Sequence, residues 1–123
     1  MTKKVCWAKE PTEADYQAAR DYLQLVFPEA TATKLVASLR RSALTRRPAK
    51  DLLRASNLPL LDAKEPKVKS DLKKLHKSKP LSPVLLVRGN MAHSMPLVVA
   101  DGYHRICAVC YFDEDAPVVC RIS

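Results

Sequence analysis

The sequence predicts an α+β fold, in which several N-terminal helices pack on a small mixed or antiparallel sheet. Two observations lead to this prediction. The first two thirds of the chain place apolar residues at helical spacing, whereas the last third contains three short apolar runs typical of buried strands. The chain of 123 residues is long enough to bury a core, and its apolar content of 47% is ordinary for a globular protein. We therefore expect a single domain over 1–123, with a helical N-terminal extension (1–62) and a core (63–123).

Four stretches before residue 80 are predicted to be helical. Thr12 precedes two acidic residues and indicates a helix start, and Pro28 marks the end of that helix. Thr33 is predicted to cap the second helix, and Asn57 to end the third. The predicted helices cover 12–27, 33–41, 49–56 and 67–77.

Residues 45–48 are predicted to be a basic connector between the second and third helices. The helices 33–41 and 49–56, joined by this connector, are also compatible with a helix-turn-helix. That interpretation is weakened because the connector lacks glycine and is longer than the usual turn of about 3–4 residues.

The last third of the chain is predicted to form strands around one helix. The runs 84–88 and 97–100 are close enough in sequence to pair as an antiparallel hairpin with a long loop. A short helix over 103–111 follows, and 118–122 is predicted to be the final strand. Residues 5–11 precede the first helix as a strand or arm, anchored by Trp7.

The charge of the chain is concentrated in its middle. The formal net charge is +8, and residues 34–79 contain fourteen Lys and Arg against four acidic residues. Such a field favours polyanions, either nucleic acid or nucleotide phosphates. Within the helix 67–77 the lysines form either a solvated face or a phosphate-facing, DNA-binding surface, and no aromatic residue lies among them to stack on single-stranded bases. These lysines are Lys67, Lys69, Lys73, Lys74 and Lys77.

The cysteines are predicted to be reduced thiols in a cytoplasmic protein. The start of the chain has a basic pair but no following apolar region, so no signal peptide is expected, and no run is long enough to span a membrane. His104, Cys107 and Cys110 are zinc-type ligands at three-residue intervals, but the first and last diverge by about 120° on a helix. We therefore predict no metal site, and we expect Cys107, Cys110 and Cys120 to be core residues.

The polar residues between the predicted strand 97–100 and the helix 103–111 are the candidate site. Gly102 allows close approach of the backbone, and the positive end of a helix dipole favours an anion. Arg105 has the fork geometry that suits a phosphate. Two alternatives remain open. The alternative to phosphate binding for Arg105 is a salt bridge to Asp101, and the alternative for His104 is a capping or packing role.

Three segments resemble the core of the ParB/sulfiredoxin superfamily. They are Leu81–Val87, Val99–Ala108 and Ala116–Ile122, so the resemblance covers about residues 79–122. It implies a phosphate held by the backbone N–H groups around Gly102, Tyr103 and His104, with a further contact from Arg105. Asp101 would orient the turn or bind a ligand hydroxyl.

The resemblance implies a nucleotide- or phosphate-binding domain, nucleic-acid-associated or regulatory, whose ligand is a nucleoside phosphate, with Mg²⁺ as a possible companion. DNA would then contact either the additional N-terminal helices or the lysine-bearing helix. The alternative is a metal-dependent nuclease or phosphoryl-transfer enzyme, for which Asp101 is the candidate catalytic residue. Tyr103 stands where the sulfiredoxins have a nucleophilic cysteine. A phenol with a pKa near 10 cannot replace a thiolate, so sulfiredoxin activity is not expected.

Overall fold

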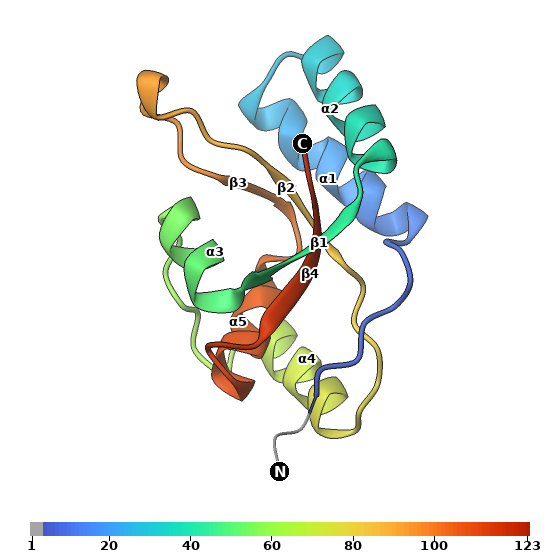
Figure 1. The fold of residues 1–123 in the computed structure, drawn as a ribbon, viewed down its shortest axis with the longest axis vertical. Coiled ribbons are helices and arrows are strands. Elements are labelled where there is room, and N and C mark those ends of the chain that lie inside the picture. The colour runs from blue at the N-terminus through green and yellow to red at the C-terminus, as the bar shows by residue number, and fades with distance from the viewer. Residues whose placement is uncertain (1–3) are drawn as a thin grey trace.

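The computed structural model describes residues 4–123, so Lys3 of the N-terminal basic pair lies outside the described residues. The predicted α+β class is confirmed. The described part of the chain contains five α-helices and a four-stranded mixed sheet, with the helices on both faces of the sheet (Figure 1).

The sheet has the strand order β1-β4-β2-β3. β2 runs parallel to β4, whereas β1 pairs antiparallel with β4, and β3 pairs antiparallel with β2. The predicted antiparallel hairpin of the runs 84–88 and 97–100 is therefore confirmed, and its loop contains a short 3-10 helix, Met91–His93. The strands are β1 (Leu44–Pro48), β2 (Val84–Val87), β3 (Val98–Asp101) and β4 (Pro117–Ile122).

The helices form two groups that cover opposite faces of the sheet. α1 and α2 pack against Leu85, Val87, Val98 and Ala100 in one apolar cluster. α3, α4 and α5 enclose the other cluster, which contains the β2 side chains that alternate with these. Both faces of the central strands are consequently buried. The helices are α1 (Glu13–Val26), α2 (Glu29–Arg41), α3 (Ala49–Ser56), α4 (Pro66–His76) and α5 (Tyr103–Phe112).

Two predictions about the first half of the chain are wrong. Thr33 does not cap the second helix, because α2 begins at Glu29, directly after Pro28, and Thr33 lies inside it. Residues 45–48 are not a connector but part of β1, which pairs with β4 along its whole length. A strand between α2 and α3 rules out the helix-turn-helix interpretation. The sheet therefore includes a strand from residues 1–62 and is not confined to the C-terminal half.

Other local predictions are confirmed. Thr12 and Asp15 form a reciprocal capping box at the start of α1, and Asn57 ends α3 in the left-handed conformation. The N-terminal arm is fixed by an isolated bridge between Trp7 and Leu81. The four cysteines are free thiols; Cys107 and Cys120 are fully buried, whereas Cys110 is only partly buried and packs against the edge of the core.

Candidate functional site

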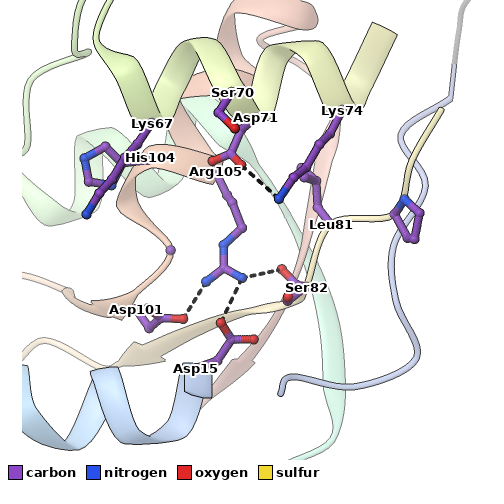
Figure 2. Close-up of a pocket in the computed structure, with 12 residues that line it drawn as sticks. Asp15, Lys67, Ser70, Asp71, Lys74, Leu81, Ser82, Asp101, His104 and Arg105 are labelled. Atoms are coloured by element: carbon purple, nitrogen blue, oxygen red, sulfur yellow. Dashed lines mark hydrogen bonds and ion pairs between the residues drawn. The ribbon is translucent and has the colours of Figure 1, made fainter. Parts of the chain in front are cut away.

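A cleft of about 370 Å³ opens beside the first turn of α5. Its walls come from four places in the chain, namely the start of α1, one face of α4, the segment that precedes β2, and the junction of β3 with α5 (Figure 2). Its lining residues are mostly polar or charged: Asp15, Lys67, Ser70, Asp71, Lys74, Pro80, Leu81, Ser82, Asp101, Gly102, His104 and Arg105.

Arg105 lies at the centre of the cleft and is held by three acceptors. Its Nη2 donates to Oδ2 of Asp101 at 2.5 Å, and its Nη1 donates to the carbonyl oxygen of Ser82 at 3.1 Å and to Oδ1 of Asp15 at 3.4 Å (Figure 2). The side chain is only 12% exposed. The guanidinium therefore ties three distant segments together, as the salt-bridge alternative from the sequence anticipates for Asp101.

Gly102 permits this junction between β3 and α5. Its φ of +110° is strained for any residue with a side chain, and an added Cβ would lie 2.3 Å from Cγ1 of Val84 and 2.9 Å from Nη2 of Arg105. The scarcity of glycine in the chain, with only two residues, already indicates that this position is special.

α5 begins at the cleft without a capping side chain. Gly102 occupies the N-cap, and the first hydrogen bond of the helix runs from the Ile106 N–H to the Gly102 carbonyl at 3.0 Å. The N–H groups of Tyr103, His104 and Arg105 donate to no other described residue. Three such N–H groups at the positive end of a helix dipole constitute a favourable environment for an anion.

Two lysines of α4 flank the cleft. Lys74 pairs with Asp71, with 3.8 Å between Nζ and Oδ1, whereas Lys67 forms no ion pair with a described residue. Lys69, Lys73 and Lys77 do not line the cleft. Of the five lysines singled out in the sequence, the structure thus brings only two to the predicted site.

His104 and Tyr103 point in different directions. His104 lines the cleft, and its Nε2 lies 3.8 Å from Oε2 of Glu65, which caps α4 by accepting from the Val68 N–H. The hydroxyl of Tyr103 donates to the carbonyl oxygen of Pro59, outside the cleft. The phenol of Tyr103 is therefore directed away from the cleft.

Burial and neighbouring charges act on the three carboxyl groups of the cleft in different ways. Burial raises the pKa of Asp101 from 3.8 to about 6, helped by the nearby Asp15 and opposed by Arg105. Burial also raises the pKa of Asp71, and Lys74 opposes it. Burial acts to raise the pKa of Asp15 as well, but the hydrogen bonds from Thr12 and the charge of Arg105 prevail and lower it.

The sequence did not indicate the roles of Asp15 and Asp71 in this cleft. Asp15 lies 90 residues from Arg105 and looks like an ordinary first-turn acid. Asp71 does carry a signal, because it is the only acidic residue within α4. The described residues contain no group of three or more His, Cys, Asp or Glu side chains arranged to hold a metal ion.

Comparison with known proteins finds no match to a family model, to a curated protein or to a solved structure. The resemblance to the ParB/sulfiredoxin superfamily therefore stays a prediction. None of the helices over residues 4–123 has the length and apolarity needed to cross a bilayer.

Proposed function

We propose that this protein binds a phosphate-bearing small molecule, in the first place a nucleoside phosphate, at the start of α5. The observation that carries the proposal is that α5 begins at a cleft with three N–H groups that have no acceptor among the described residues. Phosphate oxygens are strong acceptors and are commonly bound at such helix starts. The resemblance to ParB-like domains supports a regulatory or nucleic-acid-associated binding module.

The cleft has no net formal charge, but the distribution of its ion pairs leaves a positive region for an anionic ligand of modest size. Lys67, Lys74 and Arg105 face Asp15, Asp71 and Asp101, so the formal charges of the lining side chains balance. Asp15 and Asp101 are occupied by Arg105, and Asp71 lies near Lys74, which leaves Lys67 and the helix start to attract the phosphate. The volume of about 370 Å³ lies near the lower end of the usual range for ligand sites, about 300 to about 1,000 Å³.

The role of Arg105 in this proposal differs from the direct phosphate contact that the resemblance implies. Its Nη atoms already serve two carboxylates and a carbonyl. We assign Arg105 the task of holding the turn at residues 101–104 in place. Asp101, which accepts from Arg105 through Oδ2 and lines the cleft, would accept a hydrogen bond from a ligand hydroxyl.

A thermal-shift screen tests the proposal directly. Nucleoside mono-, di- and triphosphates and inorganic phosphate are added with and without Mg²⁺. A ligand at a hundredfold its Kd stabilises the folded state by about 2.7 kcal/mol. For a domain of this size that corresponds to a rise in Tm of several degrees.

A matched pair of variants locates the binding. Ser70→Asp adds a carboxylate on the exposed face of α4 that lines the cleft, and it should abolish the shift by repelling the phosphate. Thr31→Asp adds the same charge to an exposed position of α2 and should leave the shift intact. If no phosphate compound raises the Tm, or if the shift survives in Ser70→Asp, the proposal fails.

The pKa of Asp101 supports an enzyme as the second candidate. A carboxyl with a pKa of about 6 in a cleft is suited to accept or donate a proton near neutral pH. This alternative predicts Mg²⁺-dependent release of phosphate from a nucleotide, or cleavage of DNA, that is lost in Asp101→Asn. A binding module instead predicts thermal stabilisation with no turnover.

A further inference from the structure

The outer surface of α4 carries one sign of charge over its whole width. At about 100° per residue, the four lysines of α4 and Lys77, which caps its C-terminus, fall within one arc of about 160°, on the side opposite the buried Val68 and Leu75. Pro66 and Ser70 are the only other residues of α4 within that arc. We call this surface, formed by Lys67, Lys69, Lys73, Lys74 and Lys77, the basic face of α4.

The basic face is costly for the helix that bears it. Lys69, Lys73 and Lys77 follow one another at four-residue intervals, where like charges destabilise a helix. The first turn contains no acidic residue, and Lys67 stands there beside the positive end of the dipole. Six Lys and Arg residues of the described chain, one of them on this face, do have a close acidic partner, an example being Arg40 with Glu13 at 2.7 Å. In contrast, Lys69, Lys73 and Lys77 form no ion pair with a described residue.

We propose that the basic face of α4 binds the sugar-phosphate backbone of a nucleic acid without reading its sequence. Lysines at four-residue intervals are about 6 Å apart along the helix axis, so one row can contact several phosphates of a strand. The face offers no aromatic, arginine, asparagine or glutamine side chain for stacking on bases or for bidentate recognition of their edges. Recognition would therefore be electrostatic.

A nucleic acid fits this surface better than a membrane does. Helices that bind a bilayer surface insert an apolar face. The apolar residues of α4 are already used by the core, since Val68 is 0% and Leu75 is 2% exposed. Apart from Pro66 in the first turn, the arc of the basic face offers only ammonium groups and one hydroxyl, which suits a row of phosphates.

The basic face also adjoins the cleft. Lys67 and Lys74 belong to both, whereas Lys69, Lys73 and Lys77 lie outside the cleft. This division allows the two activities to be separated by mutation. The binding of nucleic acid proposed here does not require that the cleft bind a nucleotide.

The test measures binding of a labelled DNA duplex of random sequence, and of its single strand, by fluorescence anisotropy between about 50 and about 200 mM salt. The variant Lys69→Gln/Lys73→Gln/Lys77→Gln removes the outer row, and glutamine keeps the helix propensity. The control Lys9→Gln/Lys34→Gln/Arg88→Gln removes three exposed cations that lie outside α4.

We expect the wild type to bind DNA with a steep salt dependence. Each lost phosphate contact reduces the slope of log K against log salt by about 0.9 on duplex or about 0.7 on a single strand. The outer-row variant should lose at least about tenfold in affinity and up to about 2.7 in slope on duplex. The control should keep the wild-type slope.

Three results would overturn the inference: no DNA binding at low salt, an equal loss in the control variant, or binding of anionic vesicles or of polyglutamate in preference to DNA. The outer-row variant should keep any nucleotide-induced rise in Tm. If nucleotides do not raise the Tm of the wild type, only the proposed function is contradicted. If the slope of log K against log salt for DNA is unchanged in the outer-row variant, only this inference is contradicted.

Discussion

Replacing Asp101 by asparagine should change how the stability of the protein depends on pH. Two influences compete at this carboxyl. The guanidinium of Arg105, 2.5 Å away, favours the ionised form, whereas burial and the neighbouring Asp15 favour the protonated form. Burial prevails, and the pKa rises from 3.8 to about 6. The folded state therefore holds this proton more tightly than the unfolded chain does.

The sign and size of the effect follow from this pKa. A carboxyl whose pKa is raised by folding stabilises the folded state at low pH, and that contribution is lost as the pH rises from about 4 through about 6. A rise of about two pKa units corresponds to about 3 kcal/mol, at about 1.36 kcal/mol per unit. This is an upper limit, because the Asp101 side chain is 18% exposed and water screens part of the interaction.

Urea denaturation at constant ionic strength measures the difference. The fluorescence of Trp7, the single tryptophan, reports unfolding because its side chain packs on the core. Between pH 4.5 and pH 8, the free energy of unfolding of the wild type should fall relative to Asp101→Asn by up to about 2 kcal/mol, because pH 4.5 already lies above the unfolded pKa of 3.8. Asp21→Asn, at an exposed position of α1, serves as the control for loss of one carboxylate. If the free energy of unfolding of the wild type instead rises relative to that of Asp101→Asn as the pH increases, the charge of Arg105 outweighs burial and the pKa of Asp101 is not raised.

Three further predictions concern the junction of β3 with α5 and the thiols. Gly102→Ala should lower the free energy of unfolding by about 2 kcal/mol or more, because of its φ of +110° and the contact with Val84; an unchanged urea midpoint would contradict the strain. Arg105→Ala should cost about 3 kcal/mol, because it leaves two partly buried carboxylates without their cation, and Arg105→Lys should restore only part of that loss. At pH 8 the exposed Cys6 should react with a thiol reagent at once, whereas Cys120, whose pKa burial raises to about 11, should react only at the rate of unfolding; fast labelling of Cys120 would argue against its burial.

Local patterns predicted most of the helices and the hairpin of β2 and β3. The capping box at Thr12 and the left-handed Asn57 depend only on neighbouring residues, so the sequence alone locates them. β1 was missed for a physical reason. As an edge strand whose side chains are mostly exposed, it has no alternating apolar pattern, and its two arginines look like a connector.

The candidate site was predicted only where it is local. The turn at residues 101–105 is visible in the sequence because strand, glycine and helix follow one another directly. The contribution of Asp15 could not be predicted, because it depends on how α1 packs beside β3. The direction of the Tyr103 side chain likewise depends on Pro59, a residue 44 positions away.

The contact between Arg105 and Asp15 makes the cleft a property of the whole chain. A fragment that begins at residue 63 would keep the turn and α5, but it would lack one of the two carboxylates that hold the guanidinium. It would also lack β1, and the hydrogen-bonding edge of β4 would then be open to other strands. Attempts to trim the protein to its C-terminal half should therefore lose the geometry of the site and gain a tendency to aggregate.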